Sequence, residues 1–185
     1  MNGRYAWIHG LVGLWFLVCY VGCSSPAGPD PVAHRMRVSG VELDPRTSSP
    51  VILLQEEQGA QRKLPIWIGA HEARSITLAL EKIPSPRPNS HDLIQNIVQG
   101  INASVSRVLI TKLRGGTYYA LLELAMDGRK IRVDSRPSDA IAVAMRSGAP
   151  VFATEEVLTQ AGLPNADEAL DIDWESQTRD GLQAH

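Results

Sequence analysis

The sequence predicts an α+β fold, mainly an antiparallel β-sheet arranged as two three-stranded meanders with helices following each meander. Segments of alternating apolar and polar residues, typical of strands, come in two groups of three, within 35–68 and 105–134. The turn sequences Gly115-Gly116 and Asp127-Gly128 separate the strands of the second group. Segments with helical spacing of apolar residues follow each group, so strands and helices are segregated along the chain.

The first group contains the expected strands 35–43, 50–56 and 62–68. The apolar residues of the first of these strands change face at Gly40, which predicts a β-bulge. A helix is expected over 70–82, and a proline-rich break at 84–88 separates it from a second helix at about 90–101. That helix carries an apolar stripe made of Leu93, Ile94, Ile97, Val98 and Ile101.

The second group contains the expected strands 105–113, 117–126 and 129–134. Pro137 then starts a helix that ends near Arg146, because proline is well tolerated at the first helical position. A short strand at 150–153 and a helix at 154–161 complete the predicted domain. The 185 residues suit one such domain preceded by a short targeting segment.

The amino terminus has the features of a secretory signal peptide over residues 1–23. Arg4 gives a positive start, an apolar run follows at 10–18, and the small residues Val21-Gly22 precede Cys23. This ending resembles the bacterial lipobox, which implies cleavage, lipidation of Cys23 and a membrane anchor at the periplasmic side of the cell envelope. Ser24 favours the outer membrane. An uncleaved anchor and plain secretion are the alternatives.

Four segments are therefore expected: the signal peptide at 1–23, a flexible tether at 24–33, the folded domain at 34–162 and an acidic tail at 163–185. The two cysteines, Cys19 and Cys23, both belong to the signal peptide, so the mature domain is expected to lack disulfides. The chain has a formal net charge of −2. That small total does not indicate a nucleic-acid binder, although the acidic residues concentrate in the tail.

Three segments place polar groups at the starts of expected helices. In the first, at 68–74, Glu72 lies in the first turn and in line with the buried face of the helix. A carboxylate there needs partners, because burial without them is costly. The partners are either those of a functional site or simply backbone amides and the positive end of the helix dipole.

The second segment, at 87–92, contains a natural N-cap at Asn89 or Ser90, and Asp92 suits the first turn of the helix. Capping does not require His91. A histidine at this position can act as a general acid or base, donate to a phosphate or bind a metal. A histidine with only a structural role is the alternative.

The third segment, at 134–139, places two carboxylates, Asp134 and Asp139, around Arg136 and Ser138. Paired acids at a strand-to-helix turn can hold Mg²⁺ or Mn²⁺ through oxygen ligands. Arg136 can bind phosphate with two parallel hydrogen bonds. The alternative is an internal Arg–Asp pair that fixes the turn. If the three helix starts meet, they form a cluster suited to metal-assisted hydrolysis of phosphodiesters.

These stretches also carry a family resemblance. The blocks at 64–73, 87–93, 134–142 and 146–152 are similar to the signature blocks of the bifunctional nuclease (BFN) domain family. The resemblance covers about residues 35–162. It implies an α+β fold, self-association into a homo-oligomer, and nuclease activity on both DNA and RNA.

The leading hypothesis is an envelope-anchored, nonspecific nuclease with a divalent metal, Mg²⁺ or Mn²⁺, as cofactor. The expected catalytic residues are His91, Asp92, Glu72 and Asp139. The expected phosphate-binding residues are Arg136, Arg87 and Ser138, and the expected metal ligands are Glu72, Asp134 and Asp139. The main rival is a non-catalytic binding or assembly module of the envelope. A serine hydrolase built on Ser138 and His91 is a third hypothesis, disfavoured because no nucleophile-elbow pattern is present.

Overall fold

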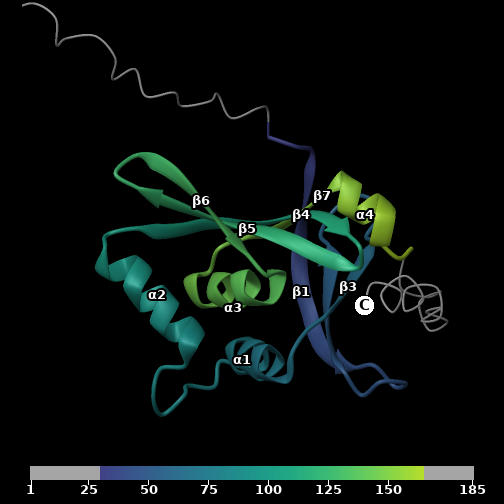
Figure 1. The fold of residues 1–185 in the computed structure, drawn as a ribbon, viewed down its shortest axis with the longest axis horizontal. Helices are drawn as coiled ribbons and strands as arrows, with labels where there is room; N and C mark the ends of the chain where they lie inside the picture. The colour runs from purple at the N-terminus through teal and green to yellow at the C-terminus, as the bar shows by residue number, and fades with distance from the viewer. Residues whose placement is uncertain (1–29, 165–185) are drawn as a thin grey trace, which may run out of the picture. The chain divides into compact units, whose positions relative to one another are not determined.

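The computed structural model describes residues 30–164, which form one mixed β-sheet with associated helices (Figure 1). The predicted signal peptide, Cys23, most of the predicted tether and nearly all of the acidic tail lie outside these residues. In chain order the elements are β1 (Ala33–Leu43), β2 (Pro50–Glu56), β3 (Lys63–Trp67), α1 (Ala70–Leu80), α2 (Ser90–Gly100), β4 (Ser104–Arg114), β5 (Thr117–Met126), β6 (Arg129–Ser135), α3 (Pro137–Ser147), β7 (Val151–Thr154) and α4 (Glu155–Ala161).

Both predicted meanders are present, but they are not separate units. The strand order in the sheet is β3-β2-β1-β7-β4-β5-β6. The short strand β7 lies between the meanders, antiparallel to β1 and parallel to β4. The prediction of two antiparallel meanders was therefore incomplete, since the sheet is mixed and continuous. A four-residue strand could not be given a partner from its sequence alone.

Most element boundaries follow from local signals along the chain. The pairing register of β1 with β2 shifts between Val38 and Gly40, which confirms the predicted bulge. Asn89 caps α2, accepting from the backbone N–H groups of His91 and Asp92, while the Asp92 side chain accepts from the Asn89 N–H. Pro137 opens α3, and Gly148 ends it with a φ of 67°, a conformation that glycine adopts easily.

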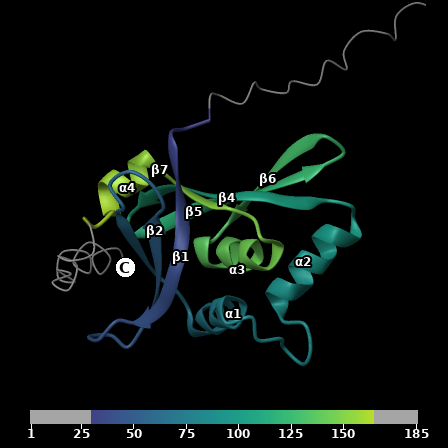
Figure 2. The same cartoon turned by 180° about the vertical axis from the view of Figure 1, so that it is seen from behind.

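Helix α3 lies between α1 and α2 and packs on β4 and β5, as both views of the fold show (Figures 1 and 2). Its side chains are buried almost continuously from Pro137 to Ala144. The core joins these residues to Ile76 of α1 and to Val108, Ile110 and Leu122 of the sheet. The burial of α3 brings the first turns of three helices together at one end of the core.

The apolar stripe of α2 is present but faces mostly outward. Val98 is buried, whereas Leu93, Ile97 and Ile101 are each more than half exposed, and Ile94 is 37% exposed. Helix α2 contacts α3 and β4, and the side that it buries carries His91 and Val98, so most of the stripe lies away from the core. Among the described residues, no helix is both long and apolar enough to span a membrane.

Candidate active site

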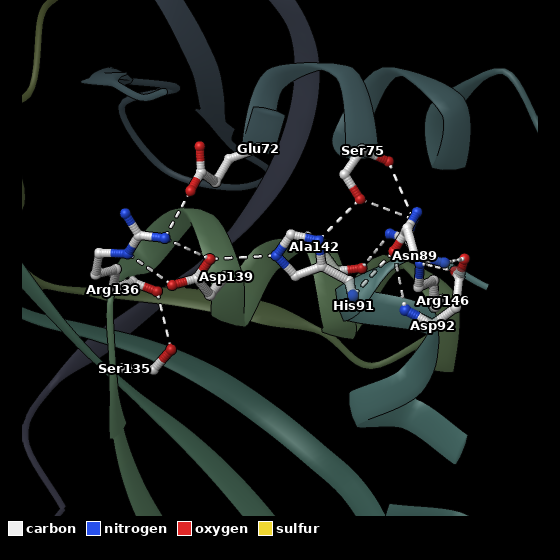
Figure 3. Close-up of polar contacts among 10 residues, drawn as sticks. All are labelled: Glu72, Ser75, Asn89, His91, Asp92, Ser135, Arg136, Asp139, Ala142 and Arg146. Carbon is white, nitrogen blue, oxygen red and sulfur yellow. Dashed lines mark hydrogen bonds and ion pairs between the residues drawn. The ribbon is translucent and has the colours of Figure 1, made fainter. Parts of the chain in front are cut away.

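The starts of α1, α2 and α3 meet in one continuous chain of polar contacts, called here the His91 network (Figure 3). Its members come from segments up to 74 positions apart in sequence: Glu72, Ser75, Asn89, His91, Asp92, Arg136, Asp139 and Arg146. The three sequence blocks that were predicted to converge therefore do so, through direct side-chain contacts.

Arg136 forms one end of the network. Its Nη2 donates to Glu72 Oε1 at 2.6 Å and to Asp139 Oδ1 at 3.0 Å, and its Nε donates to Asp139 Oδ2 at 2.7 Å. Both carboxylates are largely covered, whereas the Arg136 side chain is 66% exposed. The arginine thus bridges two acids from the solvent side and neutralises part of their charge.

His91 is the centre of the network. It is 8% exposed, and each ring nitrogen has a partner: Nε2 lies 3.2 Å from Asp139 Oδ1, and Nδ1 lies 2.9 Å from Ser75 Oγ. A carboxylate accepts hydrogen bonds, so Nε2 carries a hydrogen. The Ser75 hydroxyl can rotate, so it can donate to Nδ1 or accept from it. The imidazole can therefore gain or lose a proton at Nδ1 while both hydrogen bonds persist.

Arg146 closes the other end of the network. Its Nη2 donates to Ser75 Oγ at 2.9 Å, its Nε donates to Asp92 Oδ1, and its Nη1 donates to the Ala142 carbonyl oxygen. The guanidinium is nearly buried, with 9% of the side chain exposed. It therefore ties the C-terminal part of α3 to α1 and to the first turn of α2, which fixes where His91 stands.

The acids of the network are held in their charged form. Burial alone would raise the pKa of Asp139, but hydrogen bonds from Arg136 and His91 bring it below its usual value. Burial would also raise the pKa of Asp92, but hydrogen bonds from Arg146 and from the Asn89 backbone N–H bring it below its usual value. The pKa of Glu72 is lowered first by a hydrogen bond from its own backbone N–H and then by Arg136.

Gly69 precedes α1 and makes room for Glu72. A Cβ at position 69 would collide with the Glu72 carboxylate, which folds back over the start of the helix. That glycine therefore permits the conformation in which Glu72 reaches both its own N–H and Arg136.

Three predicted site residues, Asp134, Ser138 and Arg87, do not join the network in the described part of the chain. Asp134 pairs with Leu121 and so shares the sheet face of Glu123, opposite to that of the core residue Leu122. Ser138 is 6% exposed and lines a different cavity beside Arg136, whereas Ser75 is the hydroxyl on His91. The hydroxyl group that contacts His91 is therefore not the one on which the serine-hydrolase hypothesis was built.

The predicted three-carboxylate metal site is not assembled. Within residues 30–164 no three Asp, Glu, His or Cys side chains are grouped to hold a metal. Glu72 and Asp139 do lie together, each within 3.0 Å of the same Arg136 nitrogen. Mg²⁺ commonly binds through one or two carboxylates together with waters and substrate phosphate, and this acid pair fits that mode.

A cavity of about 540 Å³ adjoins the network. Ser75 and His91 form part of its wall, and the predicted phosphate-binding residue Arg87 lines it as well. Of the described residues around the cavity, none is Asp or Glu. The network thus opens onto a recess whose charged side chains are all basic.

Sequence reasoning missed Ser75, Arg146, Arg74 and His71. Each lies inside or next to one of the sequence blocks described above, but none lies at a helix cap. His71, Arg74 and Ser75 lie three and four residues apart on α1, a spacing that puts them on one side of the helix. That spacing was the available signal, and it became informative only once His91, in the first turn of α2, was found beside Ser75.

Comparisons with known proteins find a family model that covers these segments. The model of the bifunctional nuclease domain matches residues 52–166, which include all three helix starts. An uncharacterized protein of Mycobacterium tuberculosis strain H37Rv is 43% identical over 134 residues, which cover 72% of this chain and 79% of that protein.

More distant relatives carry a functional name. Bifunctional nuclease 1 of Oryza sativa subsp. japonica is 31% identical over 123 residues, 64% of this chain and 37% of the plant protein. Bifunctional nuclease 1 of Arabidopsis thaliana is 27% identical over 146 residues, 77% of this chain and 45% of the plant protein. The chain therefore spans less than half of these two plant proteins.

Proposed function

Because the chain belongs to the bifunctional nuclease domain family, we propose that it is a nonspecific nuclease that hydrolyses phosphodiester bonds in DNA and RNA. The supporting observation is the His91 network, in which a histidine between an ionised carboxylate and a hydroxyl borders a basic cavity. Such a histidine can move protons at a bound phosphate.

In the proposed reaction, a water oxygen bonds to phosphorus as the bond to the leaving nucleotide oxygen breaks. The proton released by the water passes to Nδ1 of His91 through the Ser75 hydroxyl. The leaving oxygen takes a proton from the solvent, and His91 then returns its own proton to the solvent. Asp139 holds the ring by its Nε2–H, and Asp92 supports it through Arg146 and the first turn of α2.

A divalent cation, Mg²⁺ or Mn²⁺, belongs to the proposal. Glu72 and Asp139 would hold it, and it would neutralise charge on the phosphate during hydrolysis. Arg136, released from the two acids, would then pair with a phosphate oxygen. Its exposed side chain leaves it free to swing away from the acids without disturbing the core.

The test compares the purified full chain with His91→Ala and Asp139→Asn on single- and double-stranded DNA and RNA, with Mg²⁺, with Mn²⁺ and with chelator. Glu42→Gln, an exposed carboxylate on β1, is the matched control. Cleavage should require metal, disappear in both site variants and persist in the control. Cleavage that survives both site substitutions contradicts the site, and no cleavage by the unmodified chain under any condition contradicts the function.

One observation favours a second candidate, a non-catalytic binding or assembly module. The acids of the network already have partners, and Asn89 with Asp92 forms a complete helix cap. Under this candidate the network only stabilises the helix starts. His91→Ala and Asp139→Asn would then lower the melting temperature while changing no activity.

We further propose that Cys23 is lipidated after signal-peptide cleavage, which would hold the chain at the periplasmic side of the envelope. The support is the sequence of residues 1–23. Expression in a bacterium with labelled palmitate should place label and protein in the membrane fraction. Cys23→Ala should lose both, whereas Cys19→Ala should lose neither. Unlabelled protein in the membrane fraction would contradict lipidation.

Self-association is proposed through the exposed apolar stripe of α2. From Leu93 to Ile101 the helix carries no charged residue, so two copies can pair without like charges meeting. Helices that lie on membranes usually carry Lys or Arg on the polar face, and here that face has none. Light scattering of the full chain in detergent should give an oligomer that Leu93→Gln with Ile97→Gln converts to monomer. A monomeric unmodified chain at all concentrations would contradict this.

A further inference from the structure

The cavity beside His91 has a composition that the proposed nuclease reaction does not by itself require. It lies between α1 and the segment leading into α2, and three basic side chains besides His91 line it: His71, Arg74 and Arg87. Hydroxyl groups of Ser75 and Ser90 border it too. The cavity thus gathers hydrogen-bond donors on several sides.

The arginines of this cavity differ from those of the network. Arg136 and Arg146 are bound to carboxylates. Arg74 and Arg87 are exposed, and neither forms an ion pair with any residue in 30–164. An arginine without a carboxylate keeps its full set of donors for a ligand, and its planar fork suits phosphate oxygens.

The size of the cavity exceeds that of a lone anion. Its volume of about 540 Å³ falls in the range usual for small-molecule sites, roughly 300–1,000 Å³. Leu78 and Pro86 give the wall two apolar patches. Such patches suit the flat face of a base or a ribose, while the arginines bind the phosphate.

We propose that this cavity is a nucleotide subsite in which Arg74 and Arg87 bind one phosphate of the nucleic-acid chain and His71 donates to it. Its ligand class is a nucleoside monophosphate unit. The proposal rests on the nuclease function and deepens it, since the subsite would hold the substrate phosphate beside Ser75 and His91. Arg74 and His71 gain roles that the sequence blocks did not suggest.

The test measures binding rather than cleavage. Calorimetric titrations of the full chain use three probes: inorganic phosphate, adenosine 5′-monophosphate, and a single-stranded oligonucleotide without terminal phosphates. Arg74→Gln and Arg87→Gln should each weaken nucleotide binding at least about tenfold, as expected for loss of a hydrogen bond to a charged group. The nucleotide affinity of Arg74→Lys should fall between those of the unmodified chain and Arg74→Gln, because lysine keeps the positive charge but lacks the planar guanidinium group. Arg114→Gln, on the β4–β5 hairpin, is the matched control.

The outcomes separate the two proposals. Nucleotide binding that depends on Arg74 and Arg87 supports the subsite even if the chain cleaves nothing, which would end only the nuclease proposal. Binding of the oligonucleotide with the same dependence, and weaker binding of inorganic phosphate, assigns the subsite to a phosphate within the strand. Equal binding by both Gln variants and the control, or no binding of any probe, overturns the subsite. Melting curves verify that the variants remain folded.

Discussion

Two of the clusters of arginine and acid in the described residues, the Glu123 cluster and the His91 network, differ in what surrounds them. The Glu123 cluster consists of Arg107, Glu123, Lys130 and Arg132 on three adjacent strands of the sheet. Glu123 is 1% exposed, yet hydrogen bonds from Arg107 and Arg132 outweigh its burial and keep its pKa below the usual value. This cluster joins neighbouring strands that backbone hydrogen bonds already connect.

The His91 network instead joins three helix starts that have no backbone pairing with one another. It contains a histidine between two partners, and it borders a basic cavity. Paired charges and lowered pKa values occur in both places, so neither feature alone marks a functional site. The distinguishing features are a titratable group that can exchange its proton and an adjoining space for a ligand.

The largest expected effect tests the structural role of the Glu123 cluster. Glu123→Ala removes the acid that three partly exposed cations share, and we expect a loss of about 1.5–3 kcal/mol in the free energy of unfolding, as for hydrogen bonds to a charged group. Urea unfolding followed by circular dichroism measures it. The control is Glu42→Ala, which removes an exposed carboxylate on β1. An equally small loss of stability in both variants would show that the Glu123 ion pairs do not stabilise the sheet.

A change outside the network should weaken it without unfolding the domain. In Gly69→Ala the new methyl group displaces only the flexible end of Glu72, so stability should hardly change. Misplacement of Glu72 should lower kcat/KM about 10- to 100-fold. Gly100→Ala, where a Cβ meets nothing, provides the comparison. Cleavage rates that match in the two variants would remove Glu72 from the site.

Acid should weaken both regions in the same pH range. Glu72, Asp92, Asp139 and Glu123 have lowered pKa values, so the stability they contribute is present above their unfolded values near 4. It is lost as pH falls through the folded values. Unfolding free energy should therefore be flat from about pH 7 to 5 and fall below about pH 4. Asp139→Asn and Glu123→Gln should each reduce that acid slope, and an unchanged slope would contradict the pairing.

The smallest expected effect concerns the cap that positions His91. Asn89→Ala removes the acceptor for two backbone N–H groups and should cost about 1 kcal/mol of stability. Asn89→Asp keeps an acceptor and should recover most of that loss. If neither variant shifts the melting temperature, α2 is held by its contact with α3 rather than by its cap.

Much of this architecture was predictable from local patterns. The bulge at Gly40, the cap at Asn89 and the helix start at Pro137 each follow from one residue and its neighbours. The insertion of β7 between the meanders was not predictable, because it depends on contacts between distant segments. The outward face of α2 was missed for the same reason, since an apolar stripe does not reveal what it packs against.

The sequence predicted which residues belong to the site better than it predicted the contacts between them. Glu72, His91 and Asp139 were expected to converge, and they do. Asp134 was grouped with Asp139 because the two are close in sequence, but strand alternation sends its side chain to the opposite face of the sheet. Ser75 and Arg146 were missed, because their roles arise only when α1, α2 and α3 pack together.

The contrast between the two clusters is tested most directly by one comparison of cleavage rates. His91→Ala and Glu123→Gln are assayed on the same single-stranded substrate, below both melting temperatures, with rates expressed per folded molecule. We expect His91→Ala to lower the rate at least about 100-fold, whereas Glu123→Gln should leave it within about twofold of the unmodified chain. Equal rates in the two variants, whether both high or both low, would contradict it.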